Sequence, residues 1–69
     1  MRLTNALLHK QVTFLAFDGN SYQGHIDHIR FASQFNEAMV KVCYFIPSYR
    51  GYATAFLDRE QFTERCAVA

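Results

Sequence analysis

A short segment, residues 17–26, constrains the fold of this chain more than any other part. Its turn-forming pair Asp18-Gly19 separates two aromatic-rich, alternating runs, a pattern typical of a tight β-hairpin. Gly24 lies inside the second run, where a glycine indicates a bulge, a sharp bend or a close backbone approach. A strand that bends sharply at a glycine allows a very small sheet to curl on itself. The segment therefore predicts a small β-barrel.

Alternation of side chains predicts four strands. Residues 38–46 form the clearest one, with the even-numbered residues on one face and the odd-numbered residues from Met39 to Phe45 on the other. Pro47 ends this strand, because proline cannot donate to the ladder. Both faces of residues 12–17 are largely apolar, so we expect both to be covered. The predicted strands are residues 12–17, 22–31, 38–46 and 52–57, with a turn over residues 47–51.

The second predicted strand breaks its own alternation. Tyr22 and Ile26 share a parity, whereas Ile29 and Phe31 have the opposite one. A bulge or bend near Asp27 would turn all four apolar side chains inward. We therefore expect an irregularity at that point of the strand.

A short helix is predicted near the N-terminus, over residues 3–11. Thr4 stands at a favourable N-cap position, and Leu3 and Leu8 occupy the two positions of a hydrophobic staple. A helix of this length must pack on something else to be stable.

The C-terminal quarter begins with a second helix signal. Residues 58–61, Asp-Arg-Glu-Gln, have the capping-box pattern and predict a helical turn, with Phe62 directed into the core. Residues 63–69 could form a closing strand or a continued helix, and both alternatives stay open. Together the predicted elements describe a mainly β fold, a small SH3-like or Sm-like barrel of four or five antiparallel strands with a short N-terminal helix and a helical turn before the C-terminal segment.

Length and composition indicate one domain, residues 1–69, with more apolar surface than it can bury. A chain of 69 residues buries about 60% of the surface that its unfolded form exposes. Apolar residues make up 51% of the chain and aromatic residues 16%, so part of this surface should lie in a subunit interface or face a ligand. We therefore expect a homo-oligomer.

The cysteines and the apolar runs restrict the cellular setting. Two cysteines, Cys43 and Cys66, are too few for a disulfide framework, although a single bridge between them is an alternative to two free thiols. No apolar run approaches the roughly 20 residues of a membrane span, and the N-terminus lacks a signal-peptide layout. We expect a cytoplasmic protein without a membrane partner.

Several strings in the first half carry a family resemblance: Asn5-Ala6-Leu7, the strand from Val12, Gly19, and above all Gln23-Gly24-His25-Ile26 followed by Phe31 and Gln34-Phe35. In these residues the chain resembles the bacterial Sm-like RNA chaperone Hfq. The resemblance implies an Sm barrel crossed by an N-terminal helix, a second strand bent at the motif glycine, and a ring of barrels that binds RNA. The family's Tyr-Lys-His string for uridine-rich RNA would fall at residues 52–54, where only Tyr52 matches. Its basic rim patch is replaced here by Leu8-His9-Lys10.

A second resemblance rests on Tyr22-Gln23-Gly24-His25-Ile26 and on the tail from Tyr52 to Phe56 and from Phe62 to Arg65. These residues are similar to the SH3-like plasmid-encoded type II dihydrofolate reductases. That family builds one active site from a Val-Gln-Ile-Tyr string of each of four subunits. Residues 53–56 here read Ala-Thr-Ala-Phe, so the resemblance implies the fold without the catalytic string.

The loop Tyr49-Arg50-Gly51-Tyr52 is the strongest candidate for a binding site. Aromatic rings stack on bases with roughly 1–3 kcal/mol each, and an arginine adds phosphate contact and cation–π attraction. The alternatives are a hairpin loop whose tyrosines cap the core, and a protein contact. The candidate nucleic-acid-binding residues, which include a basic strand as a groove wall, are Tyr49, Arg50, Tyr52, Lys41, Arg30 and His28.

No metal, cofactor or catalytic site is expected. His25 and His28 lie three residues apart on one predicted strand, so they project to opposite faces and cannot chelate one metal unless a bulge lies between them. No serine or cysteine nucleophile has a base at an interpretable spacing, and the carboxylates have structural explanations. We therefore expect that the protein is not an enzyme.

The net charge of +1, from seven Lys and Arg against six Asp and Glu, is lower than that of a typical nucleic-acid binder. Basic residues would therefore have to gather on one face. On this basis we predict a small nucleic-acid-binding regulatory module, for RNA or single strands. The alternative is a protein-interaction module, an accessory or inhibitor protein that docks through surface aromatics. A reductase-like enzyme comes third.

Overall fold

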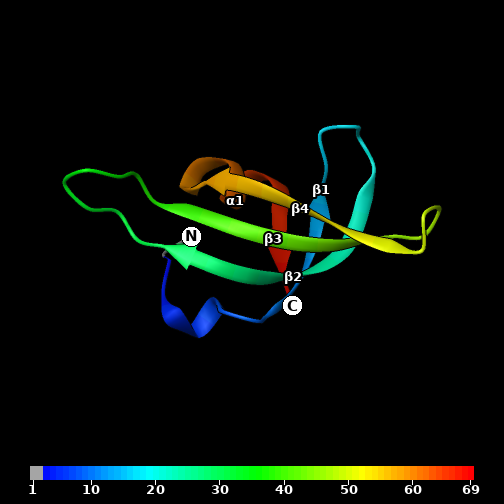
Figure 1. Ribbon diagram of the computed structural model, residues 1–69, viewed down its shortest axis with the longest axis horizontal. Helices are drawn as coiled ribbons and strands as arrows, with labels where there is room; N and C mark the ends of the chain where they lie inside the picture. The colour runs from blue at the N-terminus through cyan, green and yellow to red at the C-terminus, as the bar shows by residue number, and fades with distance from the viewer. Residues whose placement is uncertain (1–2) are drawn as a thin grey trace.

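The computed structural model describes residues 3–69, and its main feature is one antiparallel sheet of five strands in the order β4-β3-β2-β1-β5 (Figure 1). A short helix connects the fourth strand to the fifth, and a 3-10 turn precedes the first. The mainly β fold predicted from the sequence is confirmed. The elements are η1 (Asn5–Leu7), β1 (Gln11–Leu15), β2 (Ser21–Arg30), β3 (Met39–Ile46), β4 (Gly51–Asp58), α1 (Arg59–Arg65) and β5 (Cys66–Val68).

The sheet curls because β2 is long and bent. Its first half pairs with β1 and its second half with β3, so that β1 and β5 cross steeply behind β3 and β4 (Figure 1). Gly24 lies where β2 pairs with both neighbours. A Cβ at this position would collide with the carbonyl oxygen of Cys43 and lie 2.9 Å from the Cα of Tyr44. The predicted close backbone approach at Gly24 is therefore confirmed.

A second irregularity of β2 follows at Asp27. The register with β3 shifts between Ile26 and His28, which leaves Asp27 without a partner. This bulge reverses the parity of the strand, so Ile26 before it and Ile29 after it are both buried. Phe31 was expected to join them, but it is 44% exposed because β2 ends at Arg30.

The core lies inside the curled sheet and is closed by α1. This helix begins with the predicted capping box: the Asp58 carboxylate accepts from the backbone N–H of Gln61 at 2.8 Å, and the Gln61 side chain accepts from the Asp58 N–H at 3.1 Å. Its Phe62 is fully buried, as predicted, and α1 packs against β3, β4 and β5. The buried core residues are Val12, Phe14, Ala16, Ile26, Ile29, Val40, Val42, Leu57, Phe62 and Cys66.

The predicted N-terminal helix over residues 3–11 is wrong in length. Only a single 3-10 turn, Asn5–Leu7, forms, and Thr4 makes no side-chain cap bond. The chain then extends at Leu8 and enters the left-handed region at His9, with φ of 68°. The His9 N–H donates to the carbonyl of Ile26 at 2.8 Å, so the segment is held by β2 rather than by a helix of its own.

The outer side of β1 also differs from expectation. Leu15 and Phe17 remain exposed, so only one face of this segment is covered by the core. The guanidinium of Arg65 stacks 4.1 Å from the Phe17 ring centre and donates to the carbonyl of Leu15 at 3.1 Å. On this second face, Arg65 of α1 contacts the ring of Phe17, while Leu15 and Phe17 stay exposed.

The C-terminal tail combines the two alternatives left open by the sequence. The helix continues to Arg65, and residues 66–68 then form β5, which pairs with β1. Cys43 and Cys66 are free thiols, and burial raises the pKa of Cys66 to about 11. Within residues 3–69 no helix is long and apolar enough to cross a membrane.

Candidate nucleic-acid interface

Strands β2, β3 and β4 present a second face, opposite the core, that we call the outer face. Register pairs across it bring His28 beside Lys41, Lys41 beside Phe56, and Phe45 beside Tyr52. The Tyr52 and Phe56 side chains are 69% and 59% exposed. The outer face is therefore an aromatic and basic surface within one sheet.

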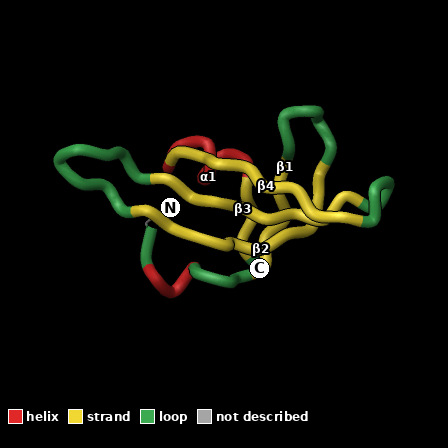
Figure 2. The backbone as a smooth tube through the Cα atoms, viewed as in Figure 1, coloured by secondary structure: helices red, strands yellow, loops and turns green. Residues whose placement is uncertain are grey.

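The structure places four of the six predicted binding residues on the outer face: Arg30, His28, Lys41 and Tyr52. Tyr49 and Arg50 lie in the turn between β3 and β4, and Arg50 has a left-handed φ of 52°. This turn and the β2–β3 connection, which follows Arg30, lie at opposite ends of the molecule (Figure 2). Four of the six residues share the outer face and two lie in the turn at one end of the sheet, so the six do not form one compact site.

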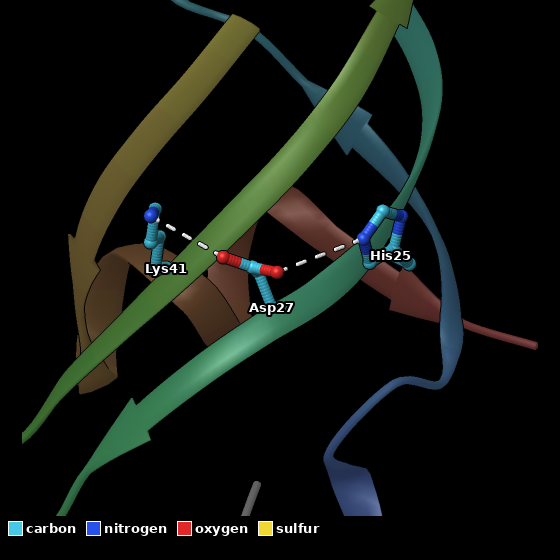
Figure 3. Close-up of polar contacts among 3 residues, drawn as sticks. All are labelled: His25, Asp27 and Lys41. Atoms are coloured by element: carbon cyan, nitrogen blue, oxygen red, sulfur yellow. Dashed lines mark ion pairs between the residues drawn. The ribbon is translucent and has the colours of Figure 1, made fainter. Parts of the chain in front are cut away.

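Lys41 is held by neighbours on the outer face. Its ammonium lies 3.3 Å from Asp27, and the same carboxylate lies 3.9 Å from the His25 ring (Figure 3). The ammonium also lies 5.9 Å from the centre of the Phe56 ring. The bulge brings Asp27 to this face, where it offsets the charge of Lys41. Lys41 is therefore less available to a phosphate than its sequence position suggests.

The other predicted cations differ in their contacts. The Nε of Arg30 donates to the carbonyl of Glu37 at 3.2 Å and thereby closes the base of the β2–β3 loop. Arg50 is exposed, and its side chain makes no hydrogen bond or ion pair within residues 3–69. Of the two arginines, Arg50 is the one free to bind an anion.

Two adjoining hollows lie next to the β3–β4 turn, and both are lined in part by Gln23 and Phe45. We call them together the Gln23–Phe45 groove. The larger, of about 480 Å³, lies between the β1–β2 and β3–β4 turns, and the smaller, of about 170 Å³, lies over Gly24. The Phe45 and Tyr52 rings meet edge to face with centres 5.3 Å apart. The groove is lined by Asn20, Ser21, Tyr22, Gln23, Phe45, Pro47 and Ser48, continuing with Gln11, Gly24, His25 and Tyr52.

The rim of the groove is fixed by Asp18. Its carboxylate accepts the Asn20 backbone N–H at 2.8 Å and the Tyr22 hydroxyl at 2.7 Å. The Asn20 N–H, and after it the Tyr22 hydroxyl, lower the pKa of Asp18, and the same carboxylate raises the pKa of Tyr22. The β1–β2 turn is thereby held in a defined shape beside the groove.

A larger hollow, of about 560 Å³, lies between the β2–β3 loop and α1. Among the described residues its lining has four carboxylates, those of Glu37, Asp58, Glu60 and Glu64, and one cation, Arg59. Carboxylates repel phosphate, so its larger volume does not make it the better site for a nucleic acid.

Sequence reasoning missed Gln23, Phe45 and Phe56 as candidates. The signal that could have found Phe45 and Phe56 is the four-residue turn between Ile46 and Gly51, because it fixes the register of β3 and β4. Counting back from that turn pairs Phe45 with Tyr52. The bulge that brings Asp27 to Lys41 was expected, but its consequence for the charge of Lys41 was not.

Comparisons of this chain with protein-family models, with curated proteins and with solved structures found no match. The resemblances to Hfq and to the type II reductases stay predictions. Function must therefore be argued from the site itself.

Proposed function

We propose that this protein is a small nucleic-acid-binding regulatory module that takes up single strands, RNA in preference, in the Gln23–Phe45 groove. The observation that carries the proposal is the lining of the groove: aromatic rings, side-chain amides and hydroxyls, with no carboxylate among its described residues. Arg50, whose side chain has no partner among the described residues, stands in the adjoining turn. Aromatic surface for a base and a cation for its phosphate thus occur next to each other.

The aromatic part of the groove suits a nucleobase. Phe45 and Tyr52 meet edge to face, and Tyr52 keeps most of its ring exposed. A base stacked on such a ring gains roughly 1–3 kcal/mol whatever its identity. The amides of Gln11, Asn20 and Gln23 can each donate and accept, so they can meet the edge of a splayed base. Double-stranded RNA presents no such unstacked base.

The charge of the site supports few phosphate contacts. Arg50 is free, His28 is exposed on the outer face, and Lys41 is offset by Asp27. With about two phosphates neutralised, the logarithm of the binding constant should fall with the logarithm of salt at a slope of about −1.4, which is about sevenfold between 50 and 200 mM. This is a weaker salt dependence than that of a strongly basic protein.

Fluorescence anisotropy with a labelled single-stranded RNA tests the proposal. Arg50→Gln should reduce the salt slope by about 0.7, because one phosphate contact is lost. Tyr52→Ala should weaken binding about fivefold or more at every salt concentration, because a stacking platform is removed.

The matched controls lie at the acidic hollow and on the far loop. Arg59→Gln removes the same charge beside Glu60 and Glu64, and Phe35→Ala removes an aromatic ring that is 83% exposed in the β2–β3 loop. Both controls should bind RNA as the parent chain does. Equal losses in the controls and in the groove variants, or no RNA binding at all, would refute the proposal.

One observation favours a second function, a protein-interaction module. Tyr49, Tyr52 and Phe56 expose 80%, 69% and 59% of their surface on a single hairpin. Exposed aromatic patches of this kind are enriched at protein interfaces. The two functions separate in the same titration, because a protein-docking hairpin would leave RNA anisotropy unchanged at all salt concentrations.

A further inference from the structure

Strand β4 forms one margin of the sheet, and its outer edge has no partner strand within residues 3–69 (Figure 1). The strand is eight residues long, Gly51–Asp58. Long exposed edges are templates for pairing with another chain, and proteins usually protect them with lysines, prolines or bulges. β4 contains none of these three devices.

The backbone groups on this open edge follow from the register. Ile26 directs both its N–H and its carbonyl toward the β1 side, so the preceding residue, His25, faces β3. The same alternation, carried across β3 into β4, leaves the N–H and C=O groups of Tyr52, Thr54 and Phe56 facing outward. The free donors and acceptors thus belong to the residues whose side chains lie on the outer face.

The sequence of β4 is chemically symmetric about Thr54. Two residues away on either side stand the aromatic residues Tyr52 and Phe56, with an alanine between each of them and Thr54. Four residues away stand opposite charges, Arg50 before the strand and Asp58 at its end. In an antiparallel pair of two such strands centred on Thr54, aromatic residues would therefore face aromatic residues, and the positive charge at one end of each strand would face the negative charge of the other strand.

We propose that β4 pairs antiparallel with β4 of a second copy of this chain, around a two-fold axis at Thr54. In this register Thr54 faces Thr54 of the second copy, Tyr52 faces Phe56 of the second copy, and Arg50 stands near Asp58 of the second copy. Threonine pairs, aromatic pairs and opposite charges are the favourable cross-strand combinations. About six backbone hydrogen bonds would form, two at each of the facing outward pairs.

The capping box sets the length of this interface. The N–H of Asp58 is already bonded to Gln61, so the backbone ladder ends at Phe56. One oxygen of the Asp58 carboxylate accepts from the Gln61 N–H, and a carboxylate has capacity for further donors. Arg50 can therefore add an ion pair at each end without disturbing the start of α1.

The other edge of the sheet is a poorer partner for β4. β5 has only three residues, Cys66–Val68, with no aromatic or charged side chain among them. A head-to-tail contact between β4 and β5 would leave the aromatic and charged pairs of β4 unmatched. A self-complementary strand instead closes as a dimer.

The dimer would place two outer faces on one side of a continuous sheet, because facing residues of an antiparallel pair project to the same side. This inference shares Arg50 and Tyr52 with the proposed RNA site, but it does not depend on RNA binding, and its tests contain no nucleic acid. Failure of the dimer would leave the Gln23–Phe45 groove intact, since the groove is formed within one copy of the chain.

Charge variants at the axis test the register. Thr54→Lys alone and Thr54→Glu alone each place like charges opposite themselves, so each should weaken dimerisation about fivefold or more in sedimentation or light scattering. An equimolar mixture of the two should recover a dimer, which also shows that both variants are folded. Gln23→Lys, on the same face but away from the edge, should dimerise as the parent chain does.

A crosslink locates the contact. Cys43 is the register partner of Thr54 within the hairpin, so the cysteine is introduced as Thr54→Cys together with Cys43→Ser. Facing residues of such a pair lie about 5.5 Å apart at Cα, within the range of a disulfide. Oxidation should give a covalent dimer, whereas Ala67→Cys with Cys43→Ser, on β5, should not.

Three results would overturn the proposal. The parent chain could remain a monomer at high micromolar concentration, or it could form an assembly larger than a dimer. A mixture of the Thr54→Cys and Ala67→Cys variants could crosslink more efficiently than Thr54→Cys alone, which would indicate pairing of β4 with β5.

Discussion

The two faces of strands β2–β4 use similar residues under different constraints. On the inner face, Val40, Val42 and Leu57 are fully buried, whereas on the outer face Tyr52 and Phe56 expose more than half of their surface. Leu57 and Phe56 are both large apolar residues and neighbours in sequence, but they project to opposite sides of the sheet. The fold itself requires the inner residues. The outer aromatic residues contribute little to the core, so binding or assembly is the better explanation for them.

The largest expected effect comes from replacing one phenylalanine of the core, Phe62 on α1, and comparing it with one on the outer face, Phe56. Phe62→Ala should lower the free energy of unfolding by about 3–5 kcal/mol, because it empties a fully buried ring site beneath α1. Phe56→Ala should cost less than about 1 kcal/mol, since it removes an exposed ring and one exposed cation–π contact with Lys41. Urea unfolding followed by circular dichroism compares the two.

A domain of this size has roughly 3–10 kcal/mol of stability, so Phe62→Ala could unfold at low denaturant or lack a transition. Either result agrees with a required inner face. If Phe56→Ala destabilised as much as Phe62→Ala, the outer face would belong to the core of the fold, and the contrast between the faces would be wrong.

The next largest change in the free energy of unfolding is expected from substitutions of two glycines. Gly24→Ala should destabilise by about 3 kcal/mol, because the added Cβ meets backbone atoms of β3 that cannot move away alone. Gly19→Ala serves as the matched change: its Cβ meets nothing within 4 Å, but its φ of 88° strains any other residue. It should cost about 1 kcal/mol.

Equal losses at the two glycines would contradict this reasoning. They would show that β2 and β3 move apart readily to accommodate the added Cβ, so that the close approach at Gly24 is not a rigid constraint. The measurement is again the midpoint and slope of urea unfolding, with the parent chain as reference.

Local signals in the sequence predicted most of the fold. The strands, the capping box at Asp58, the close approach at Gly24 and the bulge at Asp27 each depend on a few neighbouring residues. The prediction of an N-terminal helix was wrong although its signals were also local, because the interactions that compete with the helix involve a distant strand. Backbone hydrogen bonds between residues 9–10 and Ile26 stabilise an extended chain there, and no pattern within residues 3–11 predicts these bonds.

The candidate site was less predictable because it depends on pairing between strands. Tyr49, Arg50 and Tyr52 could be recognised from the sequence as candidate binding residues, because their side-chain types alone suit stacking and phosphate contact. Their relation to Phe45 and Gln23 requires the registers of β3 with β4 and of β2 with β3. The offset of Lys41 by Asp27 likewise requires knowing which way the bulge turns.

The smallest expected effect on stability tests whether the outer face is free to serve binding. Asp27→Asn removes a partly exposed ion pair with Lys41, so the free energy of unfolding should change by less than about 1 kcal/mol. If single-stranded RNA binds this face, affinity should rise and the salt slope should steepen by about 0.7, because Lys41 becomes available to one more phosphate. Glu64→Gln, on α1 at the acidic hollow, changes the net charge by the same amount. Anisotropy titrations of both variants therefore separate a local gain in RNA affinity at Lys41 from a general loss of repulsion between carboxylates and phosphates. A gain in affinity in Asp27→Asn alone supports an outer-face interface. Equal gains in both variants would place the bound strand elsewhere.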